Sequence, residues 1–334
     1  MSYQVTIQPS GHKFTVEEGQ TVLSAALDAG FALPYGCRNG ACGACKGKVL
    51  AGEADLGDFQ PTTLGKDEIA RGLALFCCTK PRGDLAIEVK EVSAAKDIPV
   101  KTLPCRVERL ERLAHDVMGI WLKLPSNERL QFLPGQYIDF LLKDGRRRSF
   151  SLANAPEEDA LLELHMRQVP GGHFSEHVFN TMKVKDIMRI NGPLGSFFLR
   201  ESDKPILFVA GGTGFAPIKS ILTHAFHHGL DRQMVLYWGA KQRRDLYLPG
   251  LPDGWQREHT HFTFIPVLSE PTAEDAWPGR TGYVHEAVLA DFADLSGYQV
   301  YACGAPPMVE AARRDFIARG LPEEEFFSDA FSYQ

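Results

Sequence analysis

Five cysteines of this chain could bind a metal, and three of them share one glycine-rich loop. Cys37, Cys42 and Cys45 follow the pattern C-x4-C-x2-C within CRNGACGACKGKVLAG, and the adjacent pair Cys77 and Cys78 comes far downstream. Thiolate sulfur is a strong ligand for iron and zinc. The spacing therefore indicates a metal centre that takes three thiolates from one loop and a fourth from a distant part of the chain.

The loop spacing also bears on which metal is bound. A C-x4-C-x2-C run with one later cysteine is typical of a plant-type 2Fe-2S site. Structural zinc, the alternative, is usually held by two CxxC-like pairs on separate knuckles. A loop around a cluster must turn sharply and direct backbone N–H groups at sulfur, which glycine permits. The loop supplies Gly36, Gly40 and Gly43, and Arg38 adds positive charge.

Composition limits the remaining possibilities. The chain has 334 residues, 44% of them apolar, so it can bury large cores and is expected to form two or three domains. It lacks an apolar run of about eighteen residues and begins with MSYQVTIQPSGHKF, so we predict no membrane span or signal peptide and expect a cytoplasmic protein. Because the cytoplasm keeps thiols reduced, the seven cysteines are expected to serve metal binding or catalysis rather than disulfide bonds. A net charge of -6 gives no reason to expect nucleic acid or an anionic membrane as partner.

The elements that must position the cysteine loop are expected to form a mostly β unit over residues 1–92. YQVTIQ and HKFTVEE alternate apolar and polar residues around Pro9 and Gly11, which predicts a hairpin. Thr21 precedes VLSAALDAG, whose helical spacing ends at Gly30, so a helix capped by Thr21 is expected. KGKVLAGEA and LAIEVKEV follow as strands.

The rest of the chain divides into a linker and two domains. SAAKDIPVKTLP is polar and contains prolines, and we predict a linker over residues 93–103. Residues 104–200 alternate short strands such as QYIDFLL with turns, which indicates an antiparallel β-barrel. In residues 201–334, apolar strands such as PILFVAGG alternate with helical segments, as in a parallel sheet covered by helices on both faces.

Two glycine-rich turns could bind phosphate, one in each of the larger domains. In VPGGHFSEHVFN, Gly171 and Gly172 let the backbone approach an anion, and Ser175 could cap a helix starting near Glu176. In FVAGGTGFAPI, a strand runs into glycines and then into Pro217, which suits the first position of a helix. This second turn is not the G-x-G-x-x-G fingerprint.

The order of these features resembles a known family along essentially the whole chain. The N-terminal part resembles a plant-type ferredoxin domain, and the remainder resembles the ferredoxin-NADP+ reductase superfamily. Their fusion is similar to the reductase components of multicomponent oxygenases, such as those of benzoate dioxygenase and methane monooxygenase. A closer likeness, through CCTKP and the tail FFSDAF, is to the CDP-6-deoxy-3,4-glucoseen reductase group.

The resemblance implies a multidomain α+β and α/β fold. Its parts would be a β-grasp ferredoxin domain over residues 1–92, an antiparallel β-barrel FAD-binding domain over 104–200, and a Rossmann-like parallel α/β NAD(P)H-binding domain over 201–334. It also selects the fourth cluster ligand, because the family has a cysteine four residues before a proline, here Cys77 before Pro81. Cys78 would then be a buried bystander.

The resemblance further assigns cofactor contacts. RRRSFSLAN is similar to the family's Arg-x-(Tyr/Phe)-(Ser/Thr) motif, in which a guanidinium meets the flavin pyrophosphate, an aromatic face meets the isoalloxazine ring and a hydroxyl lies near flavin N5. The implied flavin contacts are Arg148, Ser149, Phe150, Ser151, His165, Gly171, Gly172 and Ser175. The implied nicotinamide dinucleotide contacts are Gly211, Gly212, Thr213, Gly214, Ser269, Glu270, Cys303 and Gly304. Expected at the reacting atoms are Ser151 beside flavin N5, Cys303 beside the nicotinamide, and Phe331 over the flavin ring.

Residues of opposite charge bear on the choice between NADH and NADPH. NADP-dependent members of the superfamily bind the 2′-phosphate through a Ser-Arg pair after the third strand of the nucleotide domain, where this chain has Ser269 and Glu270. A carboxylate can bind a ribose hydroxyl and repels a phosphate, which favours NADH. Lys241, Arg243 and Arg244 follow the preceding strand and could reach a phosphate, so NADPH stays possible.

The predicted function is electron transfer. As the resemblance implies, an iron–sulfur flavoprotein reductase would take a hydride from NADH onto FAD and pass single electrons through the 2Fe-2S cluster to a partner oxygenase or iron–sulfur dehydrase, acting as a monomer. The alternatives are a stand-alone NAD(P)H diaphorase or flavin or ferric reductase, and a redox-sensing binding module. The histidines of THAFHHG are expected to be solvated side chains rather than metal ligands.

Overall fold

The computed structural model describes residues 2–91 and 98–331. The chain divides into two compact units, one of Met1–Pro99 with Gly195–Phe197 and Asp329–Gln334, the other of Val100–Leu194 with Phe198–Ser328. Residues 93–97 of the predicted linker lie outside the described residues. The first strand of the second unit begins at Lys101, inside the predicted linker.

The first unit is built on a five-stranded mixed sheet in the order β2-β1-β7-β3-β5. β1 (Ser2–Gln8) and β2 (Lys13–Glu17) form the predicted hairpin, and β1 also pairs parallel with β7 (Leu85–Glu88). Helix α1 (Val22–Asp28) begins after Thr21, whose hydroxyl accepts the Ser24 N–H, so the predicted cap is confirmed. The other elements are β3 (Lys46–Ala51), β4 (Ala54–Asp55), α2 (Lys66–Ala70), β5 (Leu73–Leu75) and β6 (Lys80–Pro81).

The short segment Gly195–Phe197, from the middle of the sequence, also belongs to the first unit. The Tyr35 N–H donates to Ser196 Oγ at 2.8 Å, and the Ser196 N–H donates to the Tyr35 carbonyl at 3.0 Å. Tyr35 lies two residues before Cys37. Both backbone groups of Tyr35 are therefore fixed by one serine at the start of the cysteine loop.

The second unit begins with a six-stranded antiparallel barrel in the order β11-β10-β13-β8-β9-β12. A bridge between Leu152 and Leu164 joins its ends, and its core includes Val107, Ile120, Phe140 and Leu162. The elements are β8 (Lys101–Ala114), β9 (Val117–Lys123), β10 (Tyr137–Leu141), β11 (Arg147–Ser151), the 3-10 turn η2 (Pro156–Glu158), β12 (Leu162–Arg167), α3 (His173–Asn180) and β13 (Ile187–Leu194).

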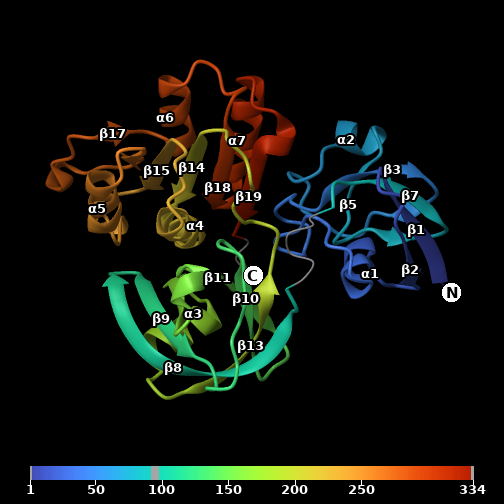
Figure 1. The fold of residues 1–334 in the computed structure, drawn as a ribbon, viewed down its shortest axis with the longest axis horizontal. Helices are drawn as coiled ribbons and strands as arrows, with labels where there is room; N and C mark the ends of the chain where they lie inside the picture. The colour runs from blue at the N-terminus through green and yellow to red at the C-terminus, as the bar shows by residue number, and fades with distance from the viewer. Residues whose placement is uncertain (1, 92–97, 332–334) are drawn as a thin grey trace. The chain divides into compact units, whose positions relative to one another are not determined.

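The same unit continues into a six-stranded sheet in the order β17-β16-β15-β14-β18-β19. β14 pairs parallel with both β15 and β18. From β14 the chain first adds β15 and β16 on one side and later adds β18 on the other side. Since such crossovers are right-handed, the change of direction places α4 and α5 on one face of the sheet and α6 and α7 on the other (Figure 1). The predicted fold class of the whole chain is therefore confirmed.

This sheet is built from strands β14 (Ile206–Gly211), β15 (Met234–Ala240), β16 (Phe262–Leu268), β17 (Arg280–Thr281), β18 (Gln299–Gly304) and β19 (Phe326–Ala330). Its helices are α4 (Phe215–His227), α5 (Gly250–Glu258), α6 (Val284–Asp291) and α7 (Pro306–Ala318). The 3-10 turns are η3 (Gly212–Gly214), η4 (Arg243–Asp245), η5 (Ala273–Asp275) and η6 (Glu323–Glu325). Pro217 is the third residue of α4, so its predicted place at the helix start is wrong.

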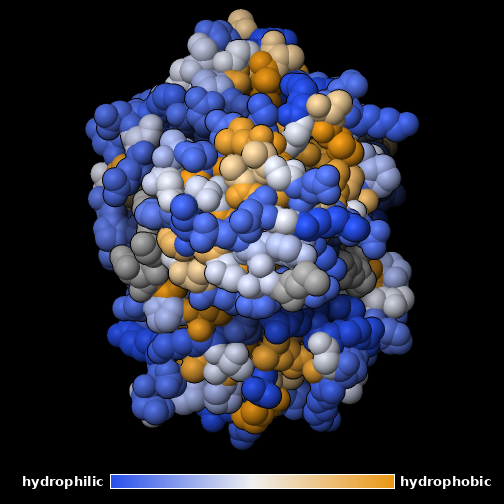
Figure 2. All heavy atoms as spheres, turned by 90° about the vertical axis from the view of Figure 1, so that its right-hand side faces the viewer, coloured by the Kyte–Doolittle hydropathy of each residue, from blue (hydrophilic) through white to orange (hydrophobic). Residues whose placement is uncertain are grey.

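Among the described residues, no helix combines the length and apolarity that crossing a membrane requires. The face drawn in Figure 2 is largely hydrophilic, with smaller groups of hydrophobic residues between the polar ones.

Candidate functional site

Four cysteine sulfurs of the first unit form two interacting pairs. The Cys37 N–H donates to Cys42 Sγ, and the Ala41 N–H donates to Cys37 Sγ, both at 3.3 Å. A hydrogen bond from the Cys42 thiol, helped by backbone N–H groups and opposed by burial, lowers the pKa of Cys37 to about 6. The Cys45 thiol in turn raises the pKa of Cys77. Two pairs of thiols match the two irons of a 2Fe-2S cluster, each of which takes two cysteine ligands.

Glycine makes the cysteine loop possible at two positions. Gly40 has a φ of 76°, and a Cβ added there would lie 2.7 Å from Phe59 Cβ and 2.9 Å from Cys78 Sγ. A Cβ on Gly36 would lie 3.1 Å from Cys42 Sγ. At Gly40 the left-handed backbone and the close approach exclude larger residues, whereas a side chain at Gly36 would require Cys42 to shift by a few tenths of an ångström. The donor set and the tight loop therefore fit an iron–sulfur cluster.

The adjacent cysteines of the pair differ in burial. Cys77 is buried, whereas Cys78 is only half-buried, so the predicted burial of Cys78 is wrong, while its place outside the ligand set stays a prediction. The two sulfurs are 3.6 Å apart, and both residues line a surface pocket with Thr21, Asp58 and Lys80. A hydrogen bond with Cys77 is the largest influence on the Cys78 thiol and raises its pKa, and the loop cysteine Cys37 adds a smaller effect in the same direction.

The predicted flavin motif lies on β11, paired with β10. The register places Ser149 opposite Asp139 and Ser151 opposite Tyr137, and the Ser149 hydroxyl donates to Asp139 Oδ1 at 2.6 Å. Ser151 is buried near the strand end, and Arg148 is half-buried with Nη1 donating to the Arg147 carbonyl.

Phe150 connects this motif to the phosphate-binding turn. Its ring lies 5.9 Å from that of Phe140 in the barrel core and 5.8 Å from that of Phe174 on α3. β11 and the start of α3 are therefore neighbours, as one flavin bound by both motifs would require.

The helix after the glycine pair starts earlier than predicted. α3 begins at His173 with Gly172 as its N-cap, and Gly171 has a φ of 73°. Ser175 lies inside the first turn, where its hydroxyl is 2.9 Å from both the Val169 and the Gly172 carbonyl and can donate to either, so its predicted capping role is wrong. The helix N-terminus remains suited to a phosphate through its free N–H groups.

His165 lies in a buried polar network that joins the barrel to the nucleotide-binding half. Its Nε2 lies 2.7 Å from Glu163 Oε1 and its Nδ1 lies 3.0 Å from the Tyr247 hydroxyl. Lys219 Nζ, from α4, lies 2.9 Å from Glu163 Oε2. Both ring nitrogens of His165 are thus bound by protein groups, which favours a positioning role over a polar contact to flavin.

Burial and these partners set the charges of the network. Burial is the largest influence on Glu163 and raises its pKa, but the hydrogen bond from His165 and the charge of Lys219 outweigh it and lower the pKa to about 2. Burial lowers the pKa of His165, against the influence of Glu163. At neutral pH the network therefore contains an ionised Glu163 and a neutral His165.

The predicted nucleotide turn meets the end of β18. Ala210 pairs with Cys303 across β14 and β18, and a Cβ on Gly214 would collide with the Cys303 carbonyl. A Cβ on Gly211 would lie 2.5 Å from Met308 Sδ, and Gly304 has a φ of 150°. β14 lies between β15, the next strand along the chain, and β18, a much later one, so the order of strands changes direction there. Parallel sheets bind ligands at such switch points, beyond the carboxyl ends of their strands. Thr213 is buried in the same turn.

Arg167 at the end of β12 is a candidate that the motifs did not identify. A Cβ on Gly212 would lie 2.9 Å from Arg167 Nη1, so the guanidinium lies against the nucleotide turn. Its Nε is 3.1 Å from Asp116 Oδ2, while Nη2 is buried and bonded to nothing within the described part of the chain. Trp238 Nε1 donates to the Gly212 carbonyl at 3.0 Å and fixes the turn from the other side.

The charged residues that bear on NADH and NADPH lie on adjacent loops. The Ser269 N–H donates to the Ala240 carbonyl and the Glu270 N–H to the Lys241 carbonyl, both at 2.9 Å. Arg243 is held by Asp275, through its N–H and through Nη1 at 3.3 Å each. Phe331 belongs to the first unit, and its predicted place over the flavin ring stays a prediction.

Three family models together match most of the chain. They describe a 2Fe-2S iron-sulfur cluster binding domain at residues 5–82, an oxidoreductase FAD-binding domain at 104–199 and an oxidoreductase NAD-binding domain at 208–314. The cysteine loop, the flavin motif and the nucleotide turn lie in these domains in that order.

Curated relatives match over nearly their full length. A CDP-6-deoxy-L-threo-D-glycero-4-hexulose-3-dehydrase reductase of Yersinia pestis is 42% identical over 331 residues, covering 99% of both chains. The phenol 2-monooxygenase reductase component DmpP of a Pseudomonas species is 36% identical, covering 99% of this chain and 95% of the relative. Among solved structures, the Amycolatopsis cytochrome P450 reductase GcoB has a TM-score of 0.79 at 33% identity, covering 99% of both chains.

The residues that these three domains bring together agree with the matches. The four thiols can bind a 2Fe-2S cluster, and the motif on β11 together with the N-terminus of α3 can bind FAD. The glycine turn after β14 can bind a nicotinamide dinucleotide. The chain is therefore an NAD(P)H-dependent oxidoreductase and belongs to the family of reductases that join a 2Fe-2S ferredoxin domain to the FAD-binding and NAD-binding domains of the ferredoxin-NADP+ reductase superfamily.

Proposed function

We propose that this reductase uses NADH and supplies single electrons to a separate iron–sulfur dehydrase that acts on a nucleotide-linked deoxyhexulose. The observation that carries the proposal is the 42% identity, over 99% of both chains, to a reductase named for such a dehydrase. An oxygenase is the second candidate partner, because reductase components of phenol and terephthalate oxygenases are also similar, at 36% and 35% identity. The reductase is proposed to act as a cytoplasmic monomer.

The proposed roles of the residues follow from where they lie. Gly211–Gly214 and Arg167 bind the dinucleotide pyrophosphate, since the turn offers backbone N–H groups and Arg167 a half-buried guanidinium that lies against the turn. Cys303 is wholly buried at the end of β18 and packs beside the nicotinamide.

On the flavin side, Arg148 and the N-terminus of α3 bind the FAD pyrophosphate, while Ser151 hydrogen-bonds near N5. FAD held there would supply the conversion of a hydride into single electrons that a one-electron cluster requires. The protein's contribution is to orient the two rings and exclude water.

Reduction of cytochrome c by NADH separates this function from the alternatives. The holoprotein should reduce cytochrome c rapidly, and Cys42→Ser, which removes a cluster ligand, should abolish this while leaving reduction of FAD by NADH intact. A diaphorase would keep cytochrome c reduction without the cluster. A sensor would show slow turnover in both proteins.

The partner is then identified by coupled turnover. The reductase with NADH is incubated with a purified CDP-hexulose dehydrase and its substrate, or with the hydroxylase component of a phenol monooxygenase and phenol. We expect product only with the dehydrase. Faster NADH-coupled product formation with the oxygenase would overturn the assignment of the partner but not that of the reductase.

A further inference from the structure

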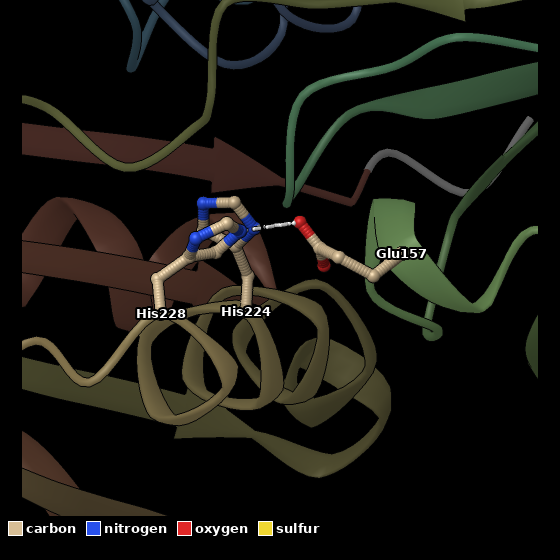
Figure 3. Close-up of side chains that lie close together, drawn as sticks. All are labelled: Glu157, His224 and His228. Atoms are coloured by element: carbon tan, nitrogen blue, oxygen red, sulfur yellow. Dashed lines mark hydrogen bonds and ion pairs between the residues drawn. The ribbon is translucent and has the colours of Figure 1, made fainter.

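Glu157, His224 and His228, which have no role in the sites described above, form a cluster at the surface of the second unit. His224 Nδ1 lies 2.7 Å and His228 Nε2 lies 2.8 Å from the same oxygen, Glu157 Oε1. The two imidazole rings are 4.4 Å apart. Figure 3 shows both rings directed from the end of α4 toward the carboxylate on η2.

The fold fixes the positions of these three side chains. Residues four apart on a helix lie on one face, which brings His224 and His228 together. The backbone before η2 is attached to α4 by two hydrogen bonds, from Ser220 Oγ to the Asn154 carbonyl at 2.7 Å and from Lys219 Nζ to the Ala153 carbonyl at 3.0 Å. Glu157 is therefore held opposite the histidine pair by contacts that do not involve the histidines.

We propose that Glu157, His224 and His228 bind one Zn2+ ion, which joins η2 to the C-terminal end of α4. Two imidazoles and one carboxylate with an open fourth position are a ligand set that zinc commonly takes in proteins. The three ligand atoms lie within 4.8 Å of one another. Ligand atoms at about 2.0–2.1 Å from a tetrahedral ion are about 3.3 Å apart, so each nitrogen must move away from Glu157 Oε1 by about half an ångström when the ion binds.

The charges and the exposure of the site suit a cation. Glu157 supplies a negative charge next to both imidazoles, and its side chain is only 22% exposed. The His228 side chain is 56% exposed, which leaves room for a water as the fourth ligand. Zinc would replace two N–H···O hydrogen bonds by three coordinate bonds, and the expectation of solvated histidines would then be wrong.

Zinc binding is tested on the holoprotein, with cluster and FAD in place. After chelator treatment, Zn2+ is titrated in competition with a chromogenic chelator, and the visible absorption of the cluster is followed to detect zinc displacing iron. We expect one Zn2+ per chain at micromolar affinity. Loss of an outer contact to a metal ligand alone costs about ten- to a hundred-fold in affinity, so His224→Ala and Glu157→Gln should each lose at least about ten-fold.

The neighbouring His227 provides the matched control. Its ring lies 5.1 Å from that of His228, but it offers no ligand atom to the cluster, so His227→Ala should bind zinc as the wild type does. Zinc should also raise the temperature of flavin release in the wild type and in His227→Ala but not in His224→Ala. The proposal is overturned if no zinc binds above the chelator background, or if it binds equally well to His224→Ala and Glu157→Gln.

Discussion

Lys241 Nζ lies 3.3 Å from Glu270 Oε1, so the basic loop after β15 and the acidic residue after β16 form an ion pair. In the sequence, Glu270 favours NADH because a carboxylate repels a 2′-phosphate, whereas Lys241 could bind that phosphate and so favours NADPH. Both side chains are well exposed, at 72% and 61%, and such a pair contributes little to stability. It does draw the positive charge of Lys241 toward Glu270 and away from a free 2′-phosphate.

We therefore predict that the enzyme prefers NADH. The repulsion between the Glu270 carboxylate and a 2′-phosphate, and the loss of one charge-assisted contact to that phosphate, are each worth about 1.5–3 kcal/mol, and 1.4 kcal/mol corresponds to about ten-fold in rate. We expect kcat/KM for NADH to exceed that for NADPH by about ten-fold or more, measured by steady-state kinetics with both cofactors.

Two variants test the origin of this preference. Glu270→Arg should reduce the ratio of kcat/KM for NADH to kcat/KM for NADPH, whereas Lys241→Gln should leave NADH preferred. Equal or better use of NADPH by the wild type would show that the attraction of the 2′-phosphate to Lys241, Arg243 and Arg244 outweighs its repulsion by Glu270.

The purified protein should contain about two irons and one FAD per chain. The two thiol pairs, Cys37 with Cys42 and Cys45 with Cys77, motivate the iron content. Metal analysis, visible absorption and flavin released on denaturation measure these contents. Zinc in the place of iron would contradict the cluster assignment.

Serine substitutions should distinguish the adjacent cysteines. Cys77 is buried and interacts with Cys45, so Cys77→Ser should lose or severely weaken the cluster, while Cys78→Ser should keep it. Flavin reduction by NADH should survive in both variants. The reverse pattern in iron content would mean that Cys78 is the fourth ligand.

A methyl group at the switch point should damage cofactor binding. The Cβ of Gly214→Ala would collide with the Cys303 carbonyl, and overpacking of this kind costs about 1–3 kcal/mol. We expect KM for NADH to rise about ten-fold or more, with FAD and iron content unchanged. Gly250→Ala is the control, because no atom lies within 4 Å of its added Cβ; an unaltered KM in Gly214→Ala would argue against the predicted nucleotide site.

The network around His165 should make the second unit sensitive to acid. The pKa of Glu163 is lowered to about 2 in the folded chain, so its stabilising effect is complete above its ordinary pKa of 4.5 and is lost as pH falls toward 2. The pKa of His165 is also lowered, from 6.5, so the unfolded chain takes up that proton first as pH falls below 6.5. Both effects reduce stability in acid.

Urea unfolding followed by flavin fluorescence between pH 7 and 4 measures this effect. The free energy of unfolding should fall by up to about 1.4 kcal/mol per pH unit for each proton taken up. Glu163→Gln should be less stable at pH 7 and should flatten the curve below pH 5. A variant curve parallel to that of the wild type would exclude Glu163 as the cause.

Local patterns in the sequence were sufficient to predict most of the framework. The hairpin, the Thr21 cap and the change from antiparallel to parallel strands depend on residues close together in sequence, and the structure confirms them. The starts of α3 and α4 were predicted less well. Ser175 and Pro217 are both typical of helix starts, but each is the third residue of its helix.

Contacts between distant residues could not be predicted in the same way. His165 and Tyr247 are 82 positions apart, and Glu157 is 67 positions from His224. Arg167 follows His165 by two residues, but nothing in the local sequence indicates that its guanidinium lies against Gly212. Such pairs are fixed by how the barrel packs on the nucleotide-binding half, which no short window of sequence encodes.

The hydrogen bonds between Tyr35 and Ser196 bear on how the chain can be recombined with its relatives. The compact unit that contains the cysteine loop is not one continuous stretch of the gene, because Gly195–Phe197 belongs to it. A ferredoxin fragment ending at residue 99 would expose the Tyr35 amide and carbonyl beside Cys37. A chimaera that exchanges N-terminal domains should therefore carry residues 195–197 from the same parent, so that loop and serine are inherited together.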